Sequence, residues 1–161
     1  KVGSVTIDGV DGTDEAIRLL RECDDFDVLV LGSVSVAGFN TIDPFALNRV
    51  LKVPVILANT ERPRLVRVRR ALRKHFKDWR GRYRVFREAN GMRMVKLEND
   101  RCLYCRGVGI TQAEAARIVR GITFLGRRPE PLRVARILAR ALTSWFSIQQ
   151  TCGRVRQKSR H

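Results

Sequence analysis

Two short runs of apolar residues constrain the fold of this chain more than any other feature. Residues 28–31 (VLVL) and 54–58 (PVILA) contain no polar side chain, which is typical of strands covered on both faces. Apolar residues at helical spacing precede the first run, from Ala16 to Cys23, and residues 45–51 predict a short helix between the runs. Strands that alternate with helices predict an α/β fold with parallel strand pairing.

The remaining elements are predicted from β-branched runs, caps and helix-starting prolines. Further strands are predicted at residues 2–7, 92–97 and 102–108, and the last two form a hairpin. Further helices are predicted to begin at Thr13, Pro63, Thr111 and Pro131, the last of them ending near residue 146. Residues 32–43 are expected to form a loop. We expect one domain over residues 1–150, followed by a basic, frayed tail over residues 151–161.

The charge of the chain is large, positive and unevenly distributed. Among 161 residues, 32 Lys and Arg oppose 16 Asp and Glu, which gives a net charge of +16. Residues 1–43 carry 3 basic and 9 acidic side chains, whereas residues 44–161 carry 29 and 7. This asymmetry predicts an acidic pole for a cation and a basic surface for a polyanion. The alternative is the solvated, Arg-rich surface of a heat-adapted protein.

Hydropathy and cysteine content indicate a cytoplasmic protein. The sequence contains no run of the ~18–20 apolar residues that a membrane span needs, and no charged-then-apolar leader opens it. We therefore expect no membrane partner. Cys102 and Cys105 lie on a predicted strand, which places their thiols on opposite faces and favours a structural role with reduced thiols.

The helix predicted from Pro63 carries the strongest partner-binding signal. Leu65, Val68 and Leu72 follow at spacings of three and four and form its apolar face. The basic residues expected to bind DNA or RNA here are Arg67, Arg69, Arg70, Arg73, Lys74 and Arg80. Such cations release counterions from a nucleic acid, and the aromatic residues interleaved after them supply stacking surfaces. The alternative is a salt-bridged surface whose aromatic residues belong to the core.

Three aspartates are candidates for a metal site. Asp8 and Asp11 lie in a glycine-flexed turn at the end of a predicted strand, and Asp43 ends the loop at residues 32–43. Carboxylate oxygens suit Mg²⁺ or Mn²⁺, and four acids around this turn oppose a bare phosphate. The predicted catalytic and metal-binding set is therefore Asp8, Asp11 and Asp43, with no organic cofactor. The alternative is a turn-and-cap role for each aspartate.

Three further residues have both a binding and a structural interpretation. Phe39 can stack on a base or fill the core beneath its loop, and Asn40 can bond a base or satisfy the backbone. Near the last helix, Arg133 can hold a phosphate or pair with Glu130.

Several of these segments resemble one family. The motifs TIDG (residues 6–9, with Asp11 and Thr13 following), AGFNTID (37–43), ALRKHFKDWR (71–80) and PEPLRVA (129–135) occur in the same order in the archaeal family catalogued as domain of unknown function ninety-nine. The resemblance covers roughly residues 4–146. This family is grouped with endonuclease V in the ribonuclease H-like superfamily. The resemblance therefore implies a mixed sheet flanked by helices and a Mg- or Mn-dependent phosphodiesterase of the endonuclease type.

The chain departs from the family pattern in two ways. Family members begin with a strand pair that carries an Asp-Asp-Gly signature, and we expect this chain to lack that pair. Endonuclease V-like enzymes also carry an aspartate near Leu31 and Gly32, where this sequence has none. The catalytic set is therefore expected to be incomplete. The alternative function is a non-catalytic binding or scaffold module that uses the basic surface and an exposed sheet edge, through which copies of the chain associate.

Overall fold

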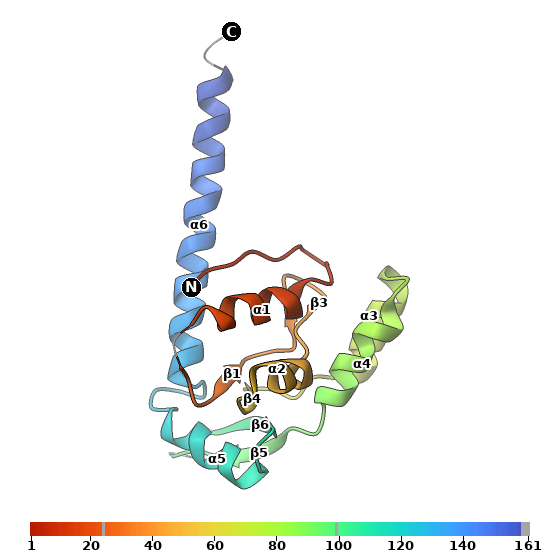
Figure 1. Cartoon of the computed structure of the whole chain (residues 1–161), viewed down its shortest axis with the longest axis vertical. Helices are drawn as coiled ribbons and strands as arrows, with labels where there is room; N and C mark the ends of the chain where they lie inside the picture. The colour runs from red at the N-terminus through yellow and green to blue at the C-terminus, as the bar shows by residue number, and fades with distance from the viewer. Residues whose placement is uncertain (24, 99, 159–161) are drawn as a thin grey trace.

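The sheet of this protein is mixed, and helices cover both of its faces (Figure 1). The computed structural model describes residues 1–23, 25–98 and 100–158, and for residues 145–158 it describes the backbone alone. The strands are β1 (Leu29–Leu31), β4 (Val55–Asn59), β6 (Cys102–Val108) and β5 (Arg93–Lys96), in that spatial order. β1 and β4 pair in parallel, whereas β4–β6 and β6–β5 are antiparallel. The predicted α/β class and the predicted hairpin are confirmed, but parallel pairing is limited to β1 and β4.

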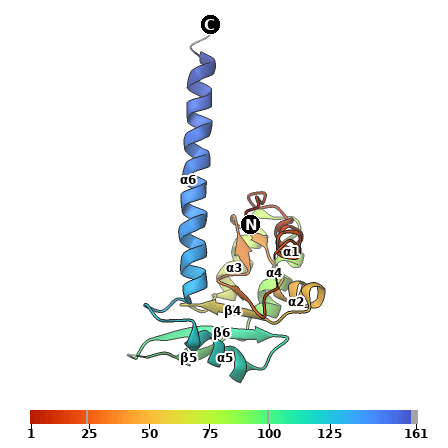
Figure 2. The same cartoon turned by 60° about the vertical axis from the view of Figure 1, so that its left-hand side comes forward.

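The central strand β4 distributes its side chains between the two layers. Ile56 and Ala58 are buried against α5 (Gln112–Gly121) on one face of the sheet. Val55 and Leu57 are buried on the other face. That face is covered by α1 (Gly12–Arg21), α2 (Pro44–Leu51), α3 (Leu65–His75) and α4 (Trp79–Ala89), and Figure 2 shows the two layers on opposite sides of the sheet. The all-apolar run at residues 54–58 is explained by this double coverage.

The helix caps follow local chemistry. At α5 the hydroxyl of Thr111 accepts from the backbone N–H of Glu114, whose carboxylate accepts from the N–H of Thr111. At α2 the Asp43 carboxylate accepts from the N–H groups of Phe45 and Ala46 at 2.9 and 3.3 Å. Each cap satisfies backbone donors that have no partner within the helix.

Four sequence-based expectations are wrong or incomplete. Residues 2–7 form no strand: the Thr6 N–H donates to the Asp11 carboxylate and the Thr6 carbonyl accepts from Asn40, so no ladder partner takes these groups. The loop expected at residues 32–43 contains a hairpin of β2 (Ser35–Val36) and β3 (Asn40–Thr41). Helix α4 was not predicted, and α1 begins one residue before the expected cap at Thr13.

Helix α6 (Glu130–Lys158) extends well away from the body of the molecule (Figure 1). It begins one residue before Pro131 and continues past the expected end near residue 146. Of the predicted tail at residues 151–161, the first eight residues continue α6, and residues 159–161 lie outside the described residues. No helix among the described residues is long and apolar enough to cross a membrane.

Candidate nucleic-acid interface

The turn at Asp8 is held in an unfavourable backbone conformation by the hairpin beside it. Asp8 has φ 55°, a left-handed value that is uncommon outside glycine. Its N–H donates to the carbonyl of Ala37 at 2.8 Å, and its carboxylate accepts from the N–H of Phe39 at 2.8 Å. Gly38 has φ 83°, and a Cβ there would overlap the Asp8 carboxylate. Asp8 therefore caps the β2–β3 turn.

Asp11 and Asn40 form the centre of the same cluster. The Asp11 carboxylate accepts from the N–H and hydroxyl of Thr6 at 3.1 and 2.8 Å and from the Asn40 amide. Asn40 is fully buried, and its amide also donates to the Thr6 carbonyl and accepts from Gly12 N–H, both at 2.9 Å. The hydrogen bond from the Thr6 hydroxyl, followed by that from Asn40, holds the pKa of Asp11 below its ordinary value.

A buried arginine from α4 completes this cluster. Arg82 is 8% exposed, and its guanidinium donates to the carbonyls of Gly9 and Phe39 at 2.7 and 2.9 Å. It also donates to the Asp78 carboxylate at 2.9 Å and lies 4.4 Å from the ring centroid of Phe76. Arg82 thus fixes the turn and the hairpin to α4. Sequence reasoning missed this role, because a lone arginine among many on a basic segment carries no distinguishing signal.

The predicted metal set is not assembled. Asp8 caps the hairpin turn, Asp11 is bonded to Thr6 and Asn40, and Asp43 caps α2. Among the residues that the structure describes, no three His, Cys, Asp or Glu side chains come together in a group that could hold a metal ion. The three carboxylates therefore do not fit a Mg²⁺ or Mn²⁺ site, and we derive no metal-dependent step from them.

The predicted nucleic-acid-binding residues of α3 and α4 are all exposed basic side chains. We define the basic face as the exposed residues Arg67, Arg69, Arg70, Arg73, Lys74 and Arg80. None of them pairs with a carboxylate within 4.0 Å among the described residues. The ring of Trp79 is contacted by two of them, with Arg73 5.5 Å and Arg80 5.0 Å from its centroid. The basic face is therefore an uncompensated cationic surface, and the salt-bridged alternative does not describe it.

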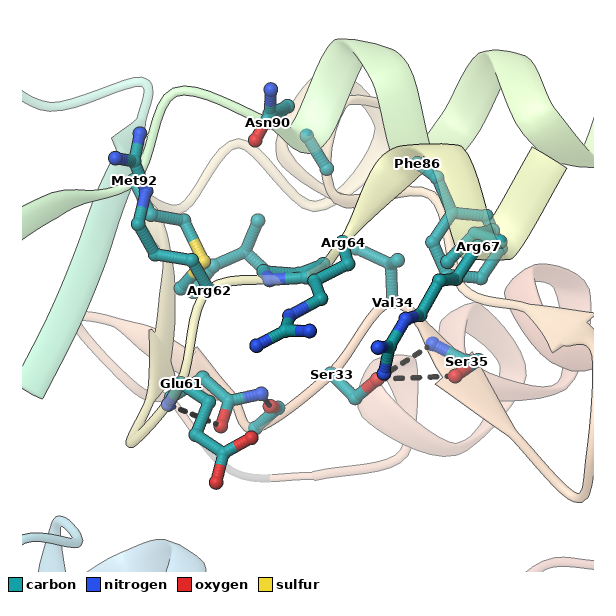
Figure 3. A pocket seen from close by; sticks show the side chains of 16 residues that line it. Ser33, Val34, Ser35, Glu61, Arg62, Arg64, Arg67, Phe86, Asn90 and Met92 are labelled. Carbon is teal, nitrogen blue, oxygen red and sulfur yellow. Dashed lines mark hydrogen bonds between the residues drawn. The ribbon is translucent and has the colours of Figure 1, made fainter.

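A pocket of about 520 Å³ lies where the parallel strands β1 and β4 end. Its polar lining residues, which we call the rim, are Ser33, Ser35, Asn59, Glu61, Arg62, Arg64, Arg67 and Asn90, most of which Figure 3 labels. Its buried apolar floor consists of Val34, Leu57, Phe86, Ala89 and Met92. We call this the arginine pocket. The carboxyl ends of strands are where open α/β sheets bind their ligands, because loops from several strands converge there.

The arginine pocket adjoins the basic face. A second hollow, of about 610 Å³, shares Arg62, Arg64 and Arg67 with it and reaches Arg70 on α3. The loops after β1 and β4 are tied together by Asn59, whose amide donates to the Gly32 carbonyl at 3.1 Å and accepts from Glu61 N–H at 3.3 Å. Sequence reasoning identified Arg67, and Arg64 as a cation of the same predicted helix, but missed the rest of the rim. The available signal was the polar stretch that follows each predicted strand.

The other predicted binding residues have structural partners. Phe39 packs edge-on against Phe76 and Phe86, with ring centroids 5.6 and 6.5 Å apart, and so lies against the core. Arg133 donates to the Glu130 carboxylate at 2.6 Å. This ion pair is the structural alternative to phosphate binding by Arg133. Cys102 and Cys105 are free thiols on β6, and burial raises the pKa of Cys105.

The chain is similar to a described protein family and to named relatives. Residues 1–143 match the family described as endonuclease dU. A UPF0215 protein of Thermococcus gammatolerans is 36% identical over 148 residues, which cover 91% of this chain and 74% of that protein. A UPF0215 protein of Methanothermobacter thermautotrophicus is 34% identical over 143 residues, which cover 87% of this chain and 69% of that protein.

The fold is similar to that of a solved structure. A crystal structure of a protein of unknown function from Archaeoglobus fulgidus superposes with a TM-score of 0.77 at 26% identity. The match covers 86% of this chain and 78% of the other. The mixed sheet with helices on both faces is therefore an architecture that an experimentally solved protein shares.

Proposed function

Because the chain belongs to the endonuclease dU family, we propose that it binds nucleic acid containing deoxyuridine through the basic face. The observation that carries this proposal is the row of exposed cations on α3 and α4 that lack carboxylate partners in the described part of the chain. A polyanion supplies the missing negative charge and gains entropy by releasing counterions. Trp79, contacted by Arg73 and Arg80, adds an aromatic surface for a base.

The family name and the endonuclease V resemblance support a finer proposal. We infer that the mixed sheet is ribonuclease H-like and that the family's reaction is strand cleavage at deoxyuridine. We assign no hydrolytic step to Asp8, Asp11 or Asp43, since each of their carboxylates accepts hydrogen bonds that hold the local backbone. The nucleic-acid interface is thus proposed from geometry, and the reaction from membership of the family.

Binding is tested by titrating a fluorescent single-stranded oligonucleotide with one deoxyuridine at several salt concentrations. Arg69→Gln with Lys74→Gln should weaken binding and reduce the log–log salt slope by about 1.4, or ~0.7 for each lost phosphate contact. The matched control is Arg49→Gln with Arg117→Gln, which removes the same charge from exposed positions on α2 and α5. Equal loss in both pairs, or no binding at low salt, would contradict the proposal.

Cleavage is tested with the same oligonucleotide in the presence of Mg²⁺ or Mn²⁺, followed by gel analysis of the products. Asp8→Asn retains an oxygen that accepts from the N–H of Phe39 but removes the charge. Unchanged cleavage supports the capping role of Asp8. Lost cleavage with an unchanged unfolding midpoint supports the metal-binding hypothesis made from the sequence.

A second candidate function, that of a scaffold, is favoured by the position of β1. β1 is an edge strand of the described sheet. Its apolar residues Leu29, Val30 and Leu31 are each half-buried. An edge of this kind can pair with another strand. Light scattering tests it: a dimer mass with no oligonucleotide binding would favour the scaffold over the nucleic-acid interface.

A further inference from the structure

The arginine pocket concentrates positive charge that no neighbour neutralises. Arg62, Arg64 and Arg67 have no carboxylate within 4.0 Å of their charged nitrogens among the described residues. Glu61 is the one acidic side chain among the lining residues and is exposed. Three arginines around one concavity therefore favour an anion, and the planar guanidinium suits two oxygens of a phosphate.

The pocket is larger and less polar than a phosphate alone requires. Its volume of about 520 Å³ lies within the range of roughly 300–1,000 Å³ that is typical of small-molecule sites. The ring of Phe86 and the side chains of Val34 and Met92 line the bottom of the pocket, each with 6–7% of its surface exposed. An apolar floor beneath a cationic rim matches a ligand with a flat ring at one end and an anion at the other.

We propose that the arginine pocket binds one nucleotide, with its phosphate on Arg64 and Arg67 and its base over the apolar floor. The proposal rests on the proposed function in that the nucleotide belongs to a strand lying on the basic face, which Arg67 and Arg70 join to the pocket. The side-chain amide of Asn90 forms no hydrogen bond within the described residues and faces the pocket (Figure 3). It supplies a donor and an acceptor for the edge of a base.

The geometry also separates the pocket from the rest of the interface. Ser33 is an exposed residue on the rim and lies outside α3, so Ser33→Trp adds an indole at the mouth of the pocket. It removes the hydrogen bonds between the Ser33 hydroxyl and Ser35 but, within the described part of the chain, no hydrogen bond to α3. Arg69 and Lys74 are absent from the pocket lining, so their replacement leaves the pocket intact. Arg67 belongs to both the pocket and the basic face, so Ser33→Trp is the variant that alters the pocket alone, and Arg69→Gln with Lys74→Gln is the variant that alters the basic face alone.

The experiment measures two affinities for each variant: that for deoxyuridine monophosphate by calorimetry, and that for the oligonucleotide by fluorescence. Deoxyuridine monophosphate should bind more tightly than inorganic phosphate or deoxyuridine. Ser33→Trp, and Arg64→Gln with Arg67→Gln, should each weaken binding of the mononucleotide at least tenfold. Arg69→Gln with Lys74→Gln should change the affinity for the mononucleotide less than twofold while weakening oligonucleotide binding. Unfolding midpoints confirm that each variant is folded.

The outcomes distinguish the two proposals. If the oligonucleotide binds but the mononucleotide does not, the pocket proposal is overturned and the proposed function stands. The same holds if Ser33→Trp binds the mononucleotide as tightly as the wild type does. Mononucleotide binding with no oligonucleotide binding overturns the proposed function and supports the pocket as a site for free nucleotides. If inorganic phosphate binds as tightly as the mononucleotide, the base contributes nothing and the proposal is overturned.

Discussion

The turn cluster (Asp8, Asp11, Asn40 and Arg82) and the arginine pocket lie on the same side of the sheet. They differ in whether their polar side chains have partners within the protein. In the turn cluster, the side chains of Asp8, Asp11, Asn40 and Arg82 all bond to nearby backbone or to each other. In the arginine pocket, by contrast, Arg64 and Arg67 form no ion pair among the described residues.

This contrast teaches which polar groups are structural and which are available. The buried Asn40 amide and Arg82 guanidinium would have to give up hydrogen bonds to bind a ligand, which costs about 1–3 kcal/mol for each buried group. A cation that lacks a partner exchanges only water. The turn cluster therefore uses its polar groups to hold the local fold, whereas the pocket presents cations without carboxylate partners in the described part of the chain.

The largest expected effect comes from removing the link between the turn cluster and α4. Arg82→Met leaves the carbonyls of Gly9 and Phe39 without their donor. We expect the free energy of unfolding, measured by urea titration, to fall by about 3 kcal/mol. Arg84→Met on the same helix, where the side chain is 65% exposed, should cost less than about 0.5 kcal/mol. Equal costs would show that Arg82 is not a structural link.

Two asparagines give the same comparison with chemistry held constant. Asn40→Ala removes three hydrogen bonds from a fully buried amide and should lower the free energy of unfolding by about 2 kcal/mol. Asn90→Ala, in the pocket, should change it by less than about 0.5 kcal/mol and weaken mononucleotide binding instead. A reversal of this pattern would remove the distinction between the two regions.

The smallest expected effect is the pH dependence contributed by Asp11. Its folded pKa lies below the ordinary value of 3.8 because Thr6 and Asn40 donate to the carboxylate. The unfolded chain therefore binds the proton more readily, so this stabilisation is complete above about pH 5 and is lost as pH falls through the folded pKa. Denaturant titrations should show the advantage of the wild type over Asp11→Asn shrinking below pH 4. An advantage that is constant with pH would contradict this role.

Local patterns were sufficient for much of the fold. The apolar runs at residues 28–31 and 54–58, the capping box at Thr111 and the hairpin of β5 and β6 each follow from short-range chemistry. The strand expected at residues 2–7 failed because a strand needs a partner, and β propensity says nothing about whether one lies beside it. The helix from Trp79 to Ala89 was missed because its aromatic residues were interpreted as stacking surfaces, although their spacing is helical.

The candidate site was harder to predict because it is made by topology. Ser33 and Arg62 are far apart in the sequence and meet only because β1 and β4 are parallel neighbours whose ends coincide. The basic residues of α3 follow from composition together with the helical spacing of the apolar residues between them, since an exposed charge needs no partner to be recognised. The three aspartates were grouped because they are acidic and close to turns, but each forms local bonds that a residue pattern does not reveal.

The hydrogen bonds of the Asn59 amide affect both the rate and the entropy of ligand binding to the arginine pocket. Its two hydrogen bonds, to the loop after β1 and to the loop after β4, make both walls of the mouth a single unit. A ligand then meets two loops that are already joined, so less ordering entropy is lost on association than if the loops moved independently. Entry should therefore be limited by diffusion and charge steering rather than by a slow rearrangement of the walls.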